Sequence, residues 1–182
     1  ETWGVEASLD RFNGMFAFAL VDLAERQLIL ARDRMGEKPL YYGWQRGGLL
    51  FGSELKALRA HPSWQGDIDR NALTLLLRHN LIPAPHTIYQ KIAKLPPASS
   101  VVFQLDGQSD VWPEPKRYWS LSDAFKPSQP TMSSLASASE ELELCLSEVI
   151  GEQMISDVPL GAFLSGGIDS STVVALMQKQ AS

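Results

Sequence analysis

The first hundred residues alternate between short apolar runs and polar turns. Residues 15–21 and 27–31 are apolar runs separated by one turn, and residues 39–44 and 48–52 flank another. Runs of this length, bounded by polar residues, predict two β-hairpins. The strands of the first hairpin are apolar on both faces, so we expect a sheet that is covered on each side.

Helical spacing predicts three helices farther along the chain. A short helix opens at Ser53 and runs to Leu58, with the Ser53 hydroxyl placed to cap its first turn. A longer helix covers residues 70–79, and Asp69 occupies its N-cap position. The third helix, residues 140–154, carries its apolar side chains on one side and is therefore amphipathic.

The spacing of these elements divides the chain into two domains. Another strand pair is predicted from residues 100–105 and the stretch around residues 117–119. Residues 123–139, which follow it, are rich in serine and proline and poor in large apolar residues, as linkers are. We therefore expect a first domain over residues 1–122, this linker, and the start of a second domain over residues 140–182.

The clearest chemical signal lies near the end of the chain. Residues 158–164 predict a buried strand, residues 165–171 read Ser-Gly-Gly-Ile-Asp-Ser-Ser, and helical spacing follows from residue 171. Strand, glycine turn and helix form the context that a phosphate-binding loop needs. Gly166 and Gly167 let the backbone approach a phosphate closely, and the helix adds the positive end of its dipole.

The side chains of this loop are consistent with a nucleotide site. Three serines supply hydroxyl donors, whereas Asp169 would repel a phosphate directly. Its presence predicts a Mg²⁺ ion that bridges the carboxylate and the phosphate oxygens. The loop lacks the Gly-Lys-Ser/Thr ending of a Walker A motif, so a kinase or GTPase loop fits poorly. A plain glycine turn with capping serines is the alternative interpretation.

Composition narrows the range of partners. The 182 residues are 45% hydrophobic with a formal net charge of −5, and no basic stripe points to nucleic acid. No apolar run approaches the ~20 residues that span a bilayer, so no membrane partner is expected. The single cysteine, Cys145, excludes an internal disulfide and fits a reducing compartment. We expect a cytoplasmic protein with small-molecule substrates, and a homodimer stays open.

Several motifs, in the same order, resemble glutamine-hydrolysing asparagine synthetases. The glycine loop, with residues 156–161 before it, looks like the start of the family's synthetase domain. Three further segments are similar to signatures in the later part of its glutaminase domain, at residues 12–19, 32–42 and 51–58. Ile168 and Met35 stand where the family more often has Leu and Phe, and both changes are conservative.

This resemblance implies a fold of α+β followed by α/β type. A partial αββα sandwich of the N-terminal-nucleophile type would be followed by the first strand, loop and helix of a parallel-sheet ATP-pyrophosphatase domain. The implied reaction converts aspartate to asparagine through an aspartyl-adenylate, with ammonia from glutamine. The implied cofactors are ATP and Mg²⁺, with Asp169 holding the metal. The residues expected to bind ATP are Leu164, Ser165, Gly166, Gly167, Asp169, Ser170 and Ser171.

The resemblance also implies parts that these residues lack. The family's glutaminase nucleophile is an N-terminal cysteine, whereas residue 1 is Glu and the first cysteine is Cys145. We expect the nucleophile and the glutamine-binding residues upstream, and Cys145 as a small buried hydrophobe. The 182 residues alone are therefore expected to catalyse neither reaction. A related amidotransferase acting on another carboxylate, or a non-catalytic fragment, remain the alternatives.

Other chemical side chains have simpler expected roles. A charge cluster could contact a substrate or a partner domain, but a solvated, salt-bridged hairpin end is the expected role. Its members are Arg32, Asp33, Arg34, Glu37 and Lys38. The three histidines have no ligand spacing, which argues against zinc. The scattered tryptophans are expected to pack in the core or at an interface.

Overall fold

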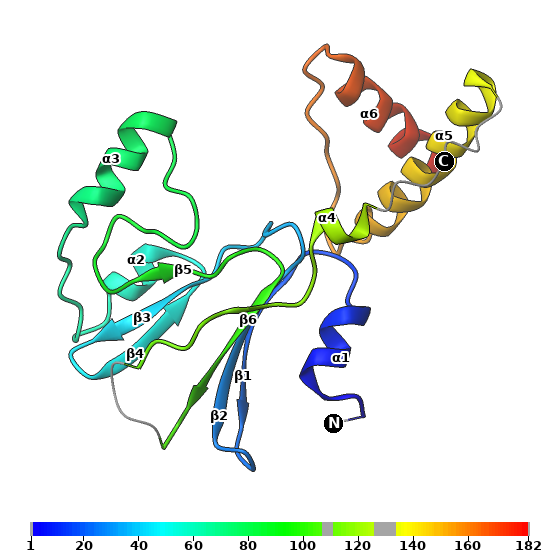
Figure 1. Cartoon of the computed structure of the whole chain (residues 1–182). Helices are drawn as coiled ribbons and strands as arrows, with labels where there is room; N and C mark the ends of the chain where they lie inside the picture. The colour runs from blue at the N-terminus through cyan, green and yellow to red at the C-terminus, as the bar shows by residue number, and fades with distance from the viewer. Residues whose placement is uncertain (1, 107–110, 126–133, 182) are drawn as a thin grey trace. The chain divides into compact units, whose positions relative to one another are not determined.

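The computed structural model describes residues 2–106, 111–125 and 134–181. The chain separates into two compact units, Glu1–Lys126 and Pro127–Ser182, coloured blue to green and yellow to red in Figure 1. The linker expected over residues 123–139 falls across this division, and residues 126–133 lie outside the described part. Each unit is considered by itself below.

A four-stranded antiparallel sheet forms half of the first unit. It contains β1 (Ala17–Asp22), β2 (Gln27–Arg32), β6 (Ser99–Gln104) and β7 (Lys116–Arg117), in the order β1-β2-β6-β7. The β1–β2 hairpin and the β6–β7 pair confirm two sequence predictions. Residue Leu20 faces Ile29 in the hairpin, and Ser99 faces Arg117 in the second pair.

A three-stranded antiparallel sheet forms the other half. It contains β3 (Tyr41–Gln45), β4 (Gly48–Gly52) and β5 (Ala93–Lys94), in the order β4-β3-β5. Arg46 and Gly47 join β3 to β4 with φ values of 47° and 76°. Two residues with positive φ between antiparallel strands are typical of a tight hairpin turn, so the second predicted hairpin is also confirmed.

The two sheets pack against each other and enclose the main core. Leu30 and Phe103 of the four-stranded sheet and Tyr42 of the three-stranded sheet belong to one buried cluster. Side chains alternate along a strand, so β2 sends Leu28 and Leu30 into this cluster and Ile29 to the opposite face. The inner layers of the unit are therefore two antiparallel sheets.

A helix lies against part of the outer face of each sheet. Helix α1 (Gly4–Arg11) buries Leu9, and its Val5 lines a hollow together with Ile29 and Val102 of the four-stranded sheet. On the other side, Leu58 of helix α2 (Leu55–Arg59) packs with Leu50 and Ile92 in a second buried cluster. The first unit is thus a mixed α/β fold with antiparallel sheets and helices outside them (Figure 1).

Of the two predicted helix caps, one is wrong and the other is confirmed. Helix α2 begins at Leu55 with Glu54 as its N-cap residue and no side-chain cap, so the predicted Ser53 cap is wrong. The backbone is still extended at Glu54, which places the Ser53 hydroxyl one residue too early to reach the first-turn amides. Helix α3 (Arg70–His79) confirms the Asp69 cap, whose Oδ1 accepts from the Asn71 amide at 2.8 Å.

We expect Asp69→Ala to lower the free energy of unfolding by about 1 kcal/mol, because the first turn of α3 loses its acceptor. Urea denaturation followed by circular dichroism measures the change. Asp67→Ala is the matched control, because this exposed carboxylate lies two residues earlier and caps no helix. Equal losses in both variants would contradict the capping role.

Trp44 and Trp64 confirm the expected packing role, whereas Trp3 and Trp112 are exposed. Trp64 meets Tyr89 edge to face with ring centroids 4.8 Å apart, and Trp44 packs against the main core. The Trp44 indole nitrogen donates to the Val111 carbonyl at 2.8 Å, which supplies the partner that a half-buried indole needs.

The described part of the second unit, residues 134–181, contains two helices and the segment between them. A short helix, α4 (Leu121–Ala124), ends the described part of the first unit. Helix α5 (Leu135–Gln153) begins five residues before the predicted start, because Ser134 caps it by accepting from the Ser137 amide. Helix α6 (Ile168–Gln180) packs on α5 and buries Leu176, while α5 buries Ile150.

Cys145 is exposed on α5, so the prediction of a small buried hydrophobe is wrong. One side of α5 packs against α6. The described part of the second unit has no further helix or strand that could cover the other sides of α5. Local amphipathic spacing therefore indicated a buried side that this unit covers only in part.

Candidate functional site: the glycine loop and the buried Arg32–Asp33 junction

The segment before the glycine loop is not the buried strand that the sequence predicts. Residues 158–164 form no strand, and Phe163 and Leu164 are largely exposed. A strand is stable only when neighbouring strands accept its hydrogen bonds and cover its faces. The described part of the second unit contains no strand that could pair with it. Leu164 consequently does not close a strand beside the loop.

The backbone of the loop has the conformation that its glycines allow. Gly166 has a φ of +80°, which L-residues rarely adopt, and a Cβ added there would meet nothing within 4 Å. Gly167 is the N-cap residue of α6 with a φ of −80° and no side-chain cap. The first-turn amides of a helix have no partner within it, so Ile168, Asp169 and Ser170 offer N–H donors to an anion.

The serine hydroxyls hold the loop together. The Ser165 and Ser170 hydroxyl oxygens lie 2.9 Å apart in a hydrogen bond. Ser170 Oγ also contacts the Gly167 carbonyl at 3.1 Å, and the Ser171 amide donates to the same carbonyl. Asp169 is exposed in the first turn of α6. Six of the seven predicted residues thus surround one exposed helix N-terminus, while Leu164 stands outside it.

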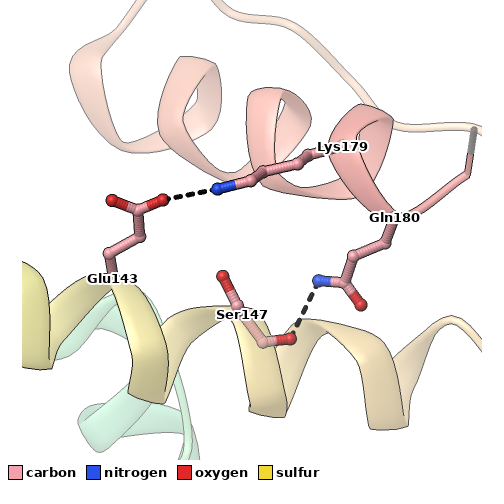
Figure 2. Close-up of polar contacts among 4 residues, drawn as sticks. All are labelled: Glu143, Ser147, Lys179 and Gln180. Carbon is pink, nitrogen blue, oxygen red and sulfur yellow. Dashed lines mark hydrogen bonds and ion pairs between the residues drawn. The ribbon is translucent and has the colours of Figure 1, made fainter.

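Two polar contacts join the far end of α6 to α5. The Lys179 ammonium lies 2.9 Å from the Glu143 carboxylate, and the Gln180 side-chain amide donates to the Ser147 carbonyl at 2.8 Å; both contacts are drawn in Figure 2. These contacts, with the buried pair Ile150 and Leu176, set the position of α6 on α5. The loop at the other end of α6 is held through this helix.

The hydrogen bond from Lys179 lowers the pKa of the Glu143 carboxyl, and the charge of the ammonium adds to the effect. A carboxyl with a depressed pKa in the folded state stabilises that state above its unfolded pKa. The stabilisation is lost as pH falls through the folded pKa. We expect the α5–α6 contact to weaken on acidification below the ordinary glutamate range, with only a small effect because both side chains are exposed.

Amide exchange of α6 measured as a function of pH tests this expectation. Glu143→Gln should lose the acid-dependent component, whereas Glu141→Gln, an exposed change on the same helix, should keep it. An identical pH profile in both variants would show that the Glu143–Lys179 pair does not contribute.

The charge cluster at the end of β2 differs from its expected solvated state. Arg32 and Asp33 are 7% and 1% exposed, and the described salt bridges of the chain do not include this pair. The Arg32 guanidinium donates to the carbonyls of Gly36, Lys38 and Leu95. Burial lowers the pKa of Arg32, while the neighbouring Asp33 charge opposes that change. The prediction of a solvated, salt-bridged hairpin end is therefore wrong for Arg32 and Asp33, whereas Glu37 and Lys38 are exposed as expected.

Asp33 accepts hydrogen bonds from backbone amides, whereas Arg32 donates to backbone carbonyls. Its carboxylate accepts from the amides of Glu37 and Lys38 at 2.9 and 3.0 Å, and from Phe16 at 3.3 Å. Gly36 lies in the turn between them with a φ of +67°, and an added Cβ would lie 2.7 Å from Pro97 Cγ. In the sequence, Gly36 and Pro39 are the residues that could have indicated a tightly closed loop. The cluster shapes the Asp33–Lys38 loop.

Two absences concern only the described part of the chain. Within residues 2–106, 111–125 and 134–181, no three His, Cys, Asp or Glu side chains gather closely enough to hold a metal ion. In the same ranges, no helix has both the length and the apolar composition needed to cross a membrane.

Comparison with known families agrees with this two-part organisation. Residues 1–119 match the family described as the glutamine amidotransferase domain, and residues 141–182 match asparagine synthase. Since the first match covers well over half of the chain, the chain belongs to the glutamine amidotransferase domain family.

Individual proteins similar to this chain are described as glutamine-hydrolysing asparagine synthetases. The chain is 37% identical over 92% of its length to a putative glutamine-hydrolysing asparagine synthetase 2 of Methanocaldococcus jannaschii. It is 35% identical over 94% of its length to asparagine synthetase 3 of Bacillus subtilis, and 32% identical over 95% to asparagine synthetase B of Escherichia coli, both described as glutamine-hydrolysing. The chain spans 32%, 26% and 25% of these relatives, respectively.

Proposed function

We propose that the protein containing this chain makes asparagine from aspartate, using ATP and ammonia released from glutamine. The observation that carries the proposal is the order of the two family matches along one chain, glutamine amidotransferase before asparagine synthase. The names of the relatives support the same assignment. Because the chain spans about a third of the first relative, the activity is assigned to the whole protein.

The proposed fold follows the same division. Residues 1–122 form the later part of a glutaminase sandwich of the N-terminal-nucleophile type, and its helix–sheet–sheet–helix layering supports this. The linker expected over residues 123–139 is proposed to end at Ser134, because residues 135–139 belong to helix α5. Residues 140–182 form the start of an ATP-pyrophosphatase domain, whose parallel sheet would supply the strand neighbours that residues 158–164 lack.

In this proposal the glycine loop binds the phosphates of ATP. The first-turn amides of α6 and the backbone around Gly166 supply donors, and Ser165, Ser170 and Ser171 supply hydroxyls. Gly167 keeps the surface next to those hydroxyls free of a side chain, since its added Cβ would lie 3.6 Å from Ser165 Oγ. Leu164 enters the proposed set as the apolar residue that borders the loop.

The loop also fits a magnesium ion, with Asp169 as its protein ligand. Mg²⁺ is commonly held by one or two carboxylates together with phosphate oxygens, so a single exposed aspartate beside the loop suffices. The ion would supply positive charge that stabilises the departing pyrophosphate. The loop itself contributes fixed donors that need no rearrangement when charge develops there.

Glutamine hydrolysis requires a nucleophile, and residues 1–119 contain no cysteine that could serve as one. The only cysteine of the chain, Cys145, lies in the part that matches asparagine synthase. We assign the glutaminase nucleophile to a residue outside these 182, and we assign no catalytic role to Cys145. We also propose that the protein is cytoplasmic and forms a homodimer.

The deciding experiment supplies the complete gene product with aspartate, glutamine, ATP and Mg²⁺, and measures asparagine, glutamate and pyrophosphate. We expect one pyrophosphate for each asparagine, and no synthesis when Mg²⁺ is withheld. Glutamate formation without asparagine would reject aspartate as the acceptor and favour another carboxylate. Formation of neither product would reject the enzyme assignment.

A further inference from the structure

Helix α3 attaches to the first unit through one of its sides only. Ala72 is buried and Leu75 is half-buried, so these two residues mark the attached side. Among the described helices and strands, none packs extensively against α3, the green helix at the upper left of Figure 1. The other sides of the helix are therefore not covered by the described part of the first unit.

A second side of α3 is apolar and exposed. Leu73, Leu76 and Leu77 have the i, i+3, i+4 spacing that places side chains on one face of a helix. They are 39%, 37% and 80% exposed, and Leu81, just after the C-cap residue Asn80, is 55% exposed. We call these four leucines the α3 face. Single exposed leucines are ordinary, whereas several on one face are typical of a contact site.

The charged residues of α3 and of the segment after it are all positive. Residues 70–105 contain no Asp or Glu, although the whole chain has a formal net charge of −5. Arg70 and Arg78 of α3 are exposed, and the described salt bridges include neither of them. The preceding carboxylate, Asp69, accepts from backbone amides at the start of the helix. A structure that contacts the α3 face should therefore carry carboxylates beside its apolar residues.

Charge and size both argue against a second copy of the chain on this face. In an antiparallel pair of α3 helices, Arg70 of one copy would lie beside Arg78 of the other, and like charges repel. A stable interface between separate proteins uses about 20–30 residues on each side, whereas the α3 face has four leucines. A segment of the same polypeptide needs a smaller contact, because covalent connection raises its effective concentration.

We propose that the α3 face docks an acidic amphipathic helix of the same polypeptide, contributed by residues outside these 182. The chain spans 32% of its Methanocaldococcus jannaschii relative, so a complete protein of similar length has most of its residues outside the chain. The docked helix places apolar side chains on the α3 face and carboxylates opposite Arg70 and Arg78, as helix pairs with flanking opposite charges do. From the described chain the contact requires α3 alone, and it is independent of the reaction that the protein catalyses.

Thiol labelling of the complete gene product tests whether the α3 face is covered. Leu77→Cys places a thiol on the face, and Asn71→Cys is the control, because residue 71 lies on the opposite side of the same helix. Peptide mass spectrometry after iodoacetamide treatment reports each position separately. We expect the thiol at position 77 to react at least about 10-fold more slowly, because a covered thiol reacts only when the contact opens. Equal rates overturn the proposal. If Leu77→Cys does not fold, Leu73→Cys takes its place.

A photo-cross-linker at position 77 identifies what covers the face. With p-benzoylphenylalanine in place of Leu77, we expect links to an acidic peptide outside residues 1–182 of the same molecule. Links to residues within 1–182 overturn the proposal. In a mixture of isotopically light and heavy protein, links that join light to heavy chains overturn it in favour of a second copy.

Charge reversal tests the acidic character of the docked helix. Arg70→Glu combined with Arg78→Glu should raise the labelling rate of the thiol in Leu77→Cys by about fivefold or more, because like charges then face each other. Arg59→Glu, an exposed change on α2, is the control and should leave the rate unchanged. An unchanged rate in the double variant rejects an acidic partner. A complete protein that makes no asparagine would reject the proposed function and leave these labelling rates as expected.

Discussion

Gly166→Ala should lower kcat/KM for ATP in asparagine synthesis by at least about 5-fold. An L-residue held in the left-handed region costs roughly 1–2 kcal/mol, which corresponds to about 5- to 30-fold in an equilibrium constant. Gly166 has a φ of +80°, so alanine must either bear this strain or move the loop. If the loop moves, its donors no longer meet the phosphates, and the loss rises toward the order of 100-fold.

The control for this prediction lies in the same exposed segment. Gly161 has open space around it and no positive φ, so Gly161→Ala should change kcat/KM less than twofold. Gly167→Ala is a second informative change, because its φ of −80° tolerates alanine while the new Cβ faces Ser165 and Ser170. Steady-state kinetics with varied ATP measures all three. Unchanged ATP kinetics in Gly166→Ala would show that the loop does not bind the nucleotide.

Asp33→Ala should lower the free energy of unfolding of the first unit by about 3–4 kcal/mol. Three backbone amides lose their acceptor, and each buried donor left unpaired costs roughly 1–3 kcal/mol unless water or a shift satisfies it. Arg32 also loses the Asp33 charge, which favours its protonated form. Urea denaturation measures the change, and Asp33→Asn should fall between wild type and alanine because one acceptor oxygen remains.

Asp106→Ala is the control for this large effect. Asp106 forms an exposed ion pair with Arg26, and exposed pairs contribute ~0–1 kcal/mol. A loss below about 1 kcal/mol in Asp33→Ala would mean that the Asp33–Lys38 loop does not depend on the buried carboxylate. The comparison thus separates a buried carboxylate that accepts backbone amides from an exposed one that forms an ion pair.

Much of the first unit followed from local pattern. The β1–β2 and β3–β4 hairpins were predicted because apolar runs and turn residues act over a few positions. Helix α1 was not predicted, since only Leu9 along its length is buried and a single apolar contact leaves little periodicity. The start of α5 was placed too late, because the polar residues after Ser134 have the composition of a linker although Ser134 caps a helix there.

The candidate site followed the sequence only in part. Gly166 adopts the positive φ that a glycine loop permits, and α6 follows it as expected. The strand predicted at residues 158–164 did not form, because a strand depends on partners elsewhere in the chain. The assignment of the loop to ATP stays a prediction, which the Gly166 and Gly161 variants test.

The sequence by itself determined the local features and the family. The tight β3–β4 turn, the Asp69 cap, the Gly166 loop and the order of the motifs each depend on neighbouring residues, so they could be read directly. Tertiary structure alone decided that Arg32 and Asp33 are buried, that Cys145 is exposed, and that Tyr118 reaches the Arg32 carbonyl. Burial and long-range hydrogen bonds depend on which distant segments pack together, and the local spacing of apolar and polar residues does not indicate that packing.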